Sequence, residues 1–308
     1  MCNAVEHSRP DVSIIIPAHN SEKYLIDCID SIRLHLPNNL TVEVLVILNG
    51  STDTSAELIN AYSIKYSWIK YWNLERSGRS YARNFGISKA CGRYLMFLDA
   101  DDFFVFGVGI KMAVKILDSN EELFAVWSDT IVRNGRQDSR IEATGFKYSD
   151  LENRNCFSIS SVLIRNENLG RFPEDMYLYE DWVFWARSLK GRSVVPLNQV
   201  SSIVIHNEEN TTARAVSGIL TGQIRARARI RDLFPRRHFT VILRDLKKEV
   251  LYISGMSREN NDDSVLAKYR FSMRTLRQLS RIPFVKYVFT SLYNKSREEH
   301  LSSYRDIQ

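Results

Sequence analysis

The chain has 308 residues, of which 44% are apolar and 25% are charged, an ordinary balance for a soluble globular protein with one large domain and an appendage, or with two domains. This composition excludes a fibre and a disordered chain. The net charge of +6 is unevenly spread, because residues 211–308 contain 20 Lys and Arg against 9 Asp and Glu. We therefore expect the C-terminal region to meet an anionic surface, either lipid head groups or nucleic acid.

The sequence also bears on the compartment. No apolar run approaches the roughly 20 residues that a transmembrane helix needs, and residues 1–7 lack the regions of a signal peptide. The four cysteines show no C-x-x-C spacing, which favours reduced thiols and argues against a zinc site. We expect a cytoplasmic protein.

Strand-like and helix-like segments alternate through the first hundred residues. Short β-branched runs predict strands, and apolar residues at helical spacing predict helices between them. The strands are expected over 12–17, 42–48, 68–72 and 94–98, and the helices over about 25–36, 56–62 and 80–90. This alternation predicts an α/β fold with a doubly wound, mostly parallel sheet.

Three carboxylates follow the strand expected at 94–98. Asp99 and Asp101 would point to the same side of an extended chain, and Asp102 adds a third negative charge. Like charges this close favour a cation between them, and Mg²⁺ or Mn²⁺ is the expected one because both prefer oxygen ligands. The alternative is a solvated strand end or the N-cap of a following helix.

Two other strand ends carry polar residues, Ala18-His19-Asn20 and Asn49-Gly50-Ser51. In doubly wound sheets ligands bind beyond the carboxyl ends of the strands, so these segments are candidates for base, ribose and phosphate contacts. The chain has no G-x-G-x-x-G after its first strand and no P-loop motif, which argues against a dinucleotide-binding domain and a P-loop NTPase.

Four segments in this order resemble the signatures of family 2 glycosyltransferases with the GT-A fold: residues 14–20, 49–53, 78–86 and 97–102. The resemblance implies a metal-dependent, inverting transfer from a nucleotide-diphospho-sugar, with a UDP-sugar as the expected donor. It implies that Asp101 binds the metal and that Asp99 touches the ribose or the metal. It also implies that the nucleotide-sugar is bound by a set of rim residues: Pro17, Ala18, Asn20, Asn49, Arg76, Arg83 and Asp99.

One position departs from the family pattern. Family members usually carry Asp-Asp-Gly-Ser after the second strand, whereas this chain has Leu48-Asn49-Gly50-Ser51. Asn49 offers an amide to a base edge but no carboxylate. The identity of the nucleotide is left open by this change.

The second half of the chain carries a further cluster. Strand-like pieces at 123–128, 129–133 and 158–165 precede Glu180-Asp181, which is expected to open a helix. By resemblance Asp181 is the general base, while Glu180 and Trp182 contact the acceptor; simple N-capping is the alternative for the acidic pair. His206 follows a strand expected at 202–205, and relatives place a histidine about here near the diphosphate or metal. A satisfied surface histidine is the alternative.

Helical spacing and basic residues dominate after residue 212. We expect a GT-A domain over 1–211, with a nucleotide-binding half at about 10–105 and an acceptor half at about 123–211, followed by a basic helical C-terminal region over 212–308. That region is expected either to lie on an anionic membrane surface or to pack internally or between subunits of a homo-oligomer. It lacks the Q-x-x-R-W motif and the membrane helices of processive synthases.

These features together predict transfer of one hexosyl or N-acetylhexosaminyl group to a saccharide or lipid-linked acceptor, by family habit in assembly of a bacterial surface polysaccharide or glycolipid. The protein would be cytoplasmic or peripheral on the cytoplasmic membrane face. A catalytically silent sugar-nucleotide-binding protein is the alternative, because of Asn49. Nucleic-acid binding rests only on the Arg-rich tail, and no recognised fold motif supports it.

Overall fold

The computed structural model describes residues 9–76, 78–206 and 216–234, together with 278, 282–285, 287–288 and 291. The chain divides into two compact units, residues 1–208 and 209–308. Of the second unit, the longest described element is α7 (Val216–Ile230). The rest of the C-terminal helical region predicted from the sequence lies mostly outside the described residues.

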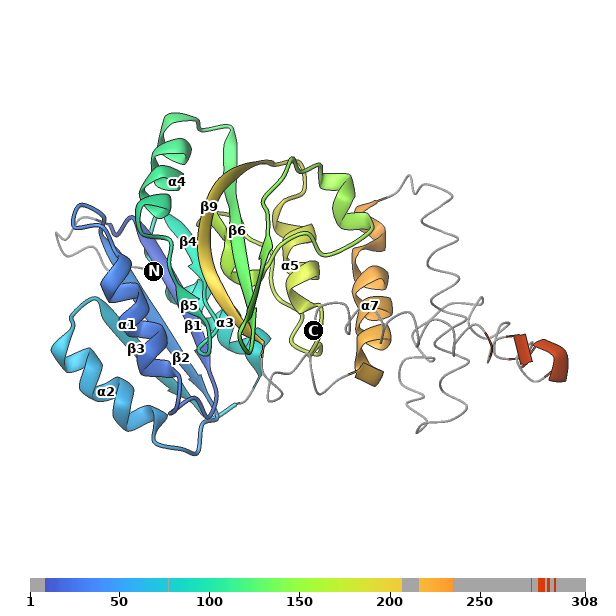
Figure 1. Ribbon diagram of the computed structural model, residues 1–308, viewed down its shortest axis with the longest axis horizontal. Coiled ribbons are helices and arrows are strands. Elements are labelled where there is room, and N and C mark those ends of the chain that lie inside the picture. The colour runs from blue at the N-terminus through green and yellow to red at the C-terminus, as the bar shows by residue number, and fades with distance from the viewer. Residues whose placement is uncertain are drawn as a thin grey trace. The chain divides into compact units, whose positions relative to one another are not determined.

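A single mixed sheet forms the centre of the first unit (Figure 1). Its described strands follow the spatial order β3-β2-β1-β4-β8-β6-β9-β5, with β7 paired to β6. The strands are β1 (Val12–Ala18), β2 (Val42–Asn49), β3 (Ile69–Leu74), β4 (Tyr94–Phe97), β5 (Phe103–Phe104), β6 (Leu123–Asn134), β7 (Gln137–Ile141), β8 (Val162–Arg165) and β9 (Ser193–His206).

The first four strands of the order, β3-β2-β1-β4, are parallel to one another. β8 then runs antiparallel to both β4 and β6, while β6 and β9 are again parallel. The predicted α/β class and the doubly wound arrangement are confirmed, with β8 as an antiparallel strand inside the sheet. The carboxyl ends of β1, β2 and β4 consequently share one edge.

The helices of the first unit connect these strands. They are α1 (Leu25–His35), α2 (Ser55–Lys65), α3 (Arg79–Lys89), α4 (Gly107–Ser119) and α5 (Glu180–Ser188), with short 3₁₀ turns at Tyr148–Glu152 and Ile159–Ser161. α4 was not expected from the sequence. Its buried positions Ile110, Ala113, Val114 and Leu117 have helical spacing, but glycines at its start conceal the beginning of the helix.

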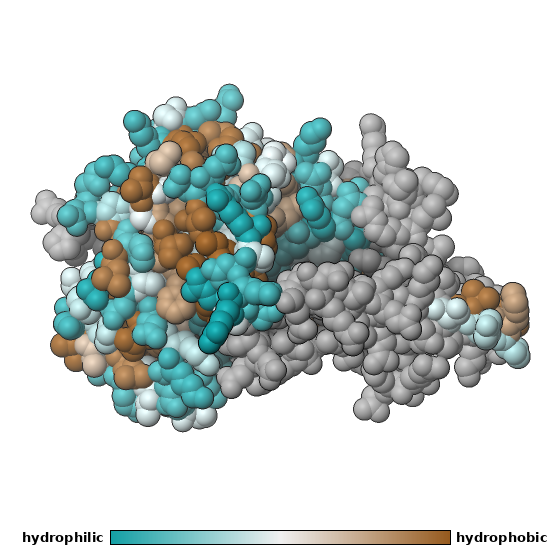
Figure 2. All heavy atoms as spheres, viewed as in Figure 1, coloured by the Kyte–Doolittle hydropathy of each residue, from teal (hydrophilic) through white to brown (hydrophobic). Residues whose placement is uncertain are grey.

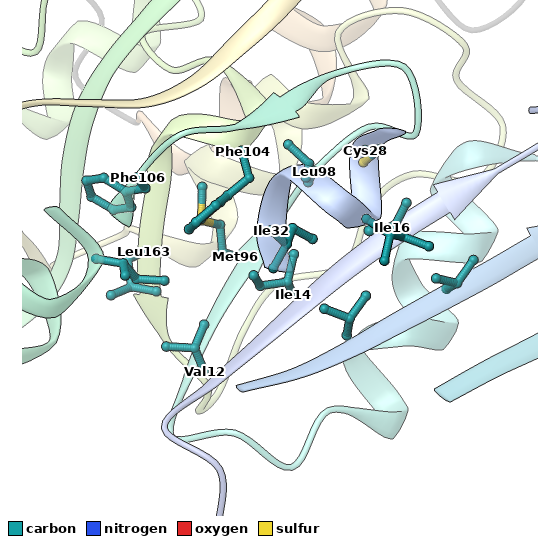
Figure 3. Close-up of a cluster of buried hydrophobic side chains, with 14 of the residues drawn as sticks. Val12, Ile14, Ile16, Cys28, Ile32, Met96, Leu98, Phe104, Phe106 and Leu163 are labelled. Carbon is teal, nitrogen blue, oxygen red and sulfur yellow. The ribbon is translucent and has the colours of Figure 1, made fainter. Parts of the chain in front are cut away.

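Alternation along the strands distributes side chains to two cores. Ile14 and Ile16 of β1 join the buried cluster with Ile32 of α1 (Figure 3). Ile15 points the other way, toward α3. A Cβ on Gly86 of α3 would lie only 2.5 Å from the Ile15 Cγ2, so glycine at this position lets the helix approach the strand closely.

Aromatic rings fill the core on the face of the sheet that receives α5. Phe97 of β4 makes edge contacts with Phe172, Phe184 and Trp185. Phe172 and Phe184 stack with ring centroids 4.1 Å apart. This packing fixes α5 against the end of β4, because large buried rings contribute both apolar area and directional contacts.

Several strand predictions for the second half need correction. The pieces expected at 123–128 and 129–133 form one strand, β6, and residues 159–161 form a 3₁₀ turn before β8 begins at Val162. β9 begins at Ser193 rather than near 202. Polar residues such as Asn198 and Gln199 hid its first half, because they break the period-2 pattern.

The surface, the helix lengths and the thiols of the described residues test the membrane and redox expectations. Figure 2 shows apolar residues gathered near the middle of one face and hydrophilic residues around them. No helix in the described part is long and apolar enough to cross a membrane. Cys28 and Cys156 are free thiols, whereas Cys91 is disulfide-bonded, so the expectation that the cysteines are reduced is wrong at Cys91.

Candidate active site

The three carboxylates after β4 have different surroundings. Asp99 Oδ1 accepts a hydrogen bond from Arg83 Nη2 at 2.6 Å. Asp102 is buried, and its Oδ1 accepts from the Ile205 backbone N–H at 3.1 Å. The Asp101 carboxylate has no hydrogen-bond partner in the described part of the chain other than its own backbone amide. Asp101 is therefore the least engaged of the three carboxylates, and Asp99 has one oxygen, Oδ1, paired with Arg83.

Charge repulsion among these aspartates is visible in their pKa values. Burial and then the negative charge of Asp99 raise the pKa of Asp101. Burial and the same neighbour raise the pKa of Asp102 well above its usual value. Although burial works in the opposite direction, the Arg83 and Arg79 guanidiniums lower the pKa of Asp99. Asp99 therefore stays ionised, and a cation near Asp101 would reduce the repulsion between the two carboxylates.

The donor set fits a cation that shares its coordination with a substrate. The described residues contain no group of three or more His, Cys, Asp or Glu side chains able to hold a metal ion. Mg²⁺ and Mn²⁺ sites that use substrate phosphates need only one or two carboxylates from the protein. Asp101 and Asp99 supply that number. The side chain of His206, the third predicted ligand, lies outside the described residues.

A buried ionic network joins the end of β4 to the start of α5. The Arg83 guanidinium, which is 1% exposed, donates to Asp99 and, through Nη1, to Glu180 Oε1 at 3.0 Å. Arg79, one turn earlier on α3, also contacts Glu180 Oε1, at 2.8 Å. Because Glu180 is only 3% exposed, both of its cationic partners are needed to offset the cost of burying its charge.

Asp181 lies at the first turn of α5, beside this network. Its Oδ2 accepts a hydrogen bond from Asn155 Nδ2 at 2.7 Å. Burial, followed by the neighbouring charge of Glu180, raises the pKa of Asp181 to about 6. The residue before the helix start, Tyr179, adopts a left-handed conformation with φ of 62°. A carboxyl group with such a pKa is ionised at neutral pH yet basic enough to take a proton.

Glu180 and Trp182, predicted to contact the acceptor, are both buried. Trp182 Nε1 donates to the Leu151 carbonyl at 2.7 Å, and the Trp182 ring meets Tyr179 edge-on. The burial and pairing of the two side chains favour a role in positioning Asp181 over direct acceptor contact.

The predicted rim residues at β1 and β2 lie together. Pro17 and Ala18 end β1, and the Ala18 carbonyl accepts a hydrogen bond from Asn49 Nδ2 at 2.9 Å. Asn20 has a positive φ of 48°, and its Oδ1 accepts from the Thr52 backbone N–H at 2.8 Å. The side-chain amides of Asn49 and Asn20 thus contact protein backbone.

Arg76, the remaining predicted donor contact, forms an ion pair with Glu174 Oε2 at 2.9 Å and lies over the Tyr81 ring. Two further residues, Arg79 and Asn155, were missed by the sequence reasoning. Arg79 precedes Arg83 by four positions on α3, a spacing that places both on one helix face and could have identified it. Asn155 lies in a loop, and nothing in its sequence context connects it with Asp181.

Comparisons with known proteins identify related sequences. The family model "Glycosyl transferase family 2" matches residues 13–176. An uncharacterized glycosyltransferase of Rickettsia conorii is 30% identical over 215 residues, covering 65% of this chain and 34% of that protein. One of Haemophilus influenzae is 31% identical over 202 residues, covering 63% of this chain and 79% of that protein. The chain spans about a third of the length of the Rickettsia relatives that it matches.

Two solved structures share the fold. The S. aureus TarS 1-349 structure in complex with UDP-GlcNAc has a TM-score of 0.61 at 17% identity and covers 97% of this chain and 92% of that chain. The mannosyltransferase PcManGT from Pyrobaculum calidifontis, in complex with GDP-Man and Mn²⁺, has a TM-score of 0.56 at 18% identity and covers 91% and 86%. At these identities the likeness establishes the architecture alone.

Proposed function

The chain belongs to glycosyl transferase family 2, and from this premise we propose that it transfers one sugar, with inversion, from a nucleotide-diphospho-sugar to an acceptor hydroxyl. The observation that carries the proposal is the buried network that joins Asp99 to Glu180 through Arg83. It holds the aspartates after β4 and the candidate base at the start of α5 in one fixed arrangement. Donor and acceptor groups would need such a fixed relation for direct displacement.

Asp181 is the proposed general base. With a pKa near 6 it is ionised at neutral pH and accepts the proton of the acceptor hydroxyl as that oxygen attacks the anomeric carbon. The hydrogen bond from Asn155 fixes the orientation of the carboxylate. Inversion follows from a single displacement, in which the nucleoside diphosphate leaves from the opposite face of the sugar.

On the donor side, Asp99 and Asp101 are the proposed holders of Mn²⁺ or Mg²⁺. When bound, the ion would offset the negative charge that develops on the leaving diphosphate. Asp99, kept ionised by Arg83 and Arg79, contributes a fixed negative charge without a proton to lose. His206 remains the proposed third contact.

The expected donor is a UDP-sugar with a hexosyl or N-acetylhexosaminyl group. Among structural neighbours, TarS was solved with UDP-GlcNAc and PcManGT with GDP-Man and Mn²⁺, which supports a nucleotide-sugar and a divalent cation as the ligand classes. A saccharide or lipid-linked acceptor, in assembly of bacterial surface polysaccharide or glycolipid on the cytoplasmic membrane face, is our proposed setting.

The domain roles follow from this assignment. We place the donor half at about residues 10–105, the acceptor half at about 123–211, and a basic accessory region at 212–308. In that last region the described side chains of Phe284 and Tyr287 are 75% and 73% exposed. Exposed aromatic residues in a basic segment support contact with an anionic membrane surface. Homo-oligomer formation is the competing role.

A donor screen tests the function. The protein is incubated with UDP-, GDP-, CDP- and dTDP-sugars, Mn²⁺ and a panel of saccharide and lipid-linked acceptors, and the released nucleoside diphosphate is measured. We expect release with one nucleotide class, dependent on both acceptor and Mn²⁺. Calorimetric binding of a nucleoside diphosphate with no turnover on any acceptor, and no slow hydrolysis of the donor, would instead identify a silent sugar-nucleotide-binding protein.

A further inference from the structure

Asn49 ties three segments of the candidate donor site together. Its Nδ2 donates to the Ala18 carbonyl at the end of β1, at 2.9 Å. Its Oδ1 accepts from the backbone N–H of Gly78, the residue before α3, at 3.0 Å. Asn49 itself is the last residue of β2 and is 4% exposed. One carboxamide thus connects β1, β2 and the start of the helix that carries Arg83.

The loop after β1 and the loop after β2 are also joined to each other by hydrogen bonds. Besides the Thr52 N–H contact of Asn20, the Asn20 backbone N–H donates to Ser51 Oγ at 3.2 Å. Glu22 Oε2 accepts from the backbone N–H of Thr54 at 3.1 Å. The loops after β1 and β2 therefore satisfy many of each other's polar groups.

We propose that Asn49 is a positioning residue, which sets the geometry of the nucleotide pocket through Ala18 and Gly78, and that it does not read the nucleobase. This inference rests on the proposed function, because it concerns the donor site of the same reaction. It gives a reason for asparagine where the family pattern has aspartate. A carboxylate could accept from Gly78 but would have no proton to donate to the Ala18 carbonyl.

The two possible roles of Asn49 predict different effects on the preference among nucleotides. If Asn49 contacted a base edge, its loss would change the preference among bases, because a buried polar group discriminates strongly against an unmatched partner. If Asn49 only shapes the pocket, its loss weakens every nucleotide by a similar factor. Selectivity among bases then comes from other groups at the rim.

Binding measurements separate the two roles. UDP, GDP, CDP and ADP are titrated calorimetrically into wild type, Asn49→Ala and Asn49→Asp with Mn²⁺ present. We expect each Kd to rise about tenfold or more in both variants, with the ratios between nucleotides unchanged. Asn60→Asp is the matched control, because Asn60 is exposed and its side-chain oxygen accepts a hydrogen bond from the Tyr71 hydroxyl; it should bind like wild type.

A second readout does not depend on nucleotide binding. The melting temperature of Asn49→Asp is compared with wild type at pH 5 and pH 8. We expect the smaller deficit at the lower pH, because burial disfavours the charged form of the introduced carboxyl and its protonated form can donate to the Ala18 carbonyl. The His19 ring contacts the Asn49 carbonyl oxygen at 2.9 Å, so each variant is compared with wild type at the same pH.

Two results would overturn the proposal. Tighter UDP binding by Asn49→Asp, or a changed ratio between nucleotides in Asn49→Ala, would make position 49 a base reader. An equal melting deficit of Asn49→Asp at both pH values would contradict a stabilising role for the hydrogen bond to the Ala18 carbonyl. If wild type binds no nucleotide, the proposed function fails, and the pH dependence of melting still decides whether Asn49 holds the segments together.

Discussion

Arg83 and Glu180 are 97 positions apart in the sequence, yet Arg83 Nη1 lies 3.0 Å from Glu180 Oε1 with both side chains almost completely buried. The pair connects the helix that follows the donor loops with the helix that carries Asp181. Buried ion pairs add little net stability compared with apolar packing, so their usual value lies in fixing a geometry. Here that geometry is the position of Asp99, after β4, relative to Asp181, in the first turn of α5.

Breaking this pair should be costly. Arg83→Met leaves Asp99 without its closest cation and Glu180 with Arg79 alone, and we expect a loss of about 3–5 kcal/mol in the free energy of unfolding. Urea denaturation measures it. Arg133→Met is the control, because Arg133 and Asp138 form an ion pair in which both side chains are 42% exposed, and its loss should cost at most about 1 kcal/mol. Equal costs for the two variants would contradict the buried role of Arg83.

Asp181→Asn should separate binding from chemistry. The amide cannot accept the acceptor's proton, so we expect turnover to fall by roughly 10²–10⁴-fold while donor affinity changes little. Steady-state release of nucleoside diphosphate and calorimetric donor titration measure the two quantities. Glu121→Gln, which changes an exposed carboxylate between α4 and β6, is the control. If donor affinity and turnover fall by similar factors, Asp181 acts as a structural N-cap of α5 and not as the base.

The pH dependence of kcat/KM should report the same carboxyl group. Since the pKa of Asp181 is about 6 and a base acts only when deprotonated, activity should fall about tenfold per unit below pH 6 and level off above pH 7. The hydrogen bond from Asn155 lowers this pKa, so Asn155→Ala should move the midpoint to higher pH. A midpoint that stays in place in Asn155→Ala would assign the titration to another group.

Asp101→Asn tests the metal assignment. The variant keeps the shape of the side chain and loses its charge, so Mn²⁺ binding in the presence of UDP should weaken by at least about 10–100-fold. Electron paramagnetic resonance of free Mn²⁺ follows binding without relying on activity. Asp138→Asn, on the exposed β7 strand, should bind Mn²⁺ like wild type. If Asp101→Asn binds Mn²⁺ with wild-type affinity, Asp101 is not a metal ligand.

Liposome flotation tests the C-terminal region. Each basic residue near an anionic bilayer contributes about 1 kcal/mol, so the protein should float with anionic liposomes at low salt and detach at high salt. Replacing the exposed Phe284 and Tyr287 by serine should weaken flotation, because it removes apolar groups available to the head-group region. No flotation at low salt, combined with a dimer in light scattering, would favour an oligomerisation role.

Local sequence patterns predicted much of the donor half. Ile14, Ile15 and Ile16 form a continuous apolar run, which is what a parallel strand buried on both faces requires. Asp99 and Asp101 stand directly after such a run, and the strand end where they were expected is the one observed. Helix α3 was predicted to within about one residue, because its apolar and small positions have helical spacing.

The features of the candidate site that the sequence did not predict depend on contacts between distant segments. Nothing near Glu180 in the sequence indicates that Arg83 and Arg79 will neutralise it, or that Asn155 will orient Asp181. Asn49 was expected to offer its amide to a base, whereas the fold engages that amide with Ala18 and Gly78. Pairing of this kind arises from tertiary packing, and neither propensity nor periodicity encodes it.

Strand β8 has a mechanical consequence. It is hydrogen-bonded to β4 on one side and to β6 on the other, so two adjacent ladders of backbone hydrogen bonds connect the proposed donor half with the proposed acceptor half. A hinge between the halves would have to break one of these ladders, so we expect substrates to close the site by moving loops over a rigid frame. Acceptor preference should then be transferable by exchanging the segments before the 3₁₀ turn at Ile159–Ser161 and before α5, residues 142–158 and 172–179, while Asn155 and the sheet are left untouched.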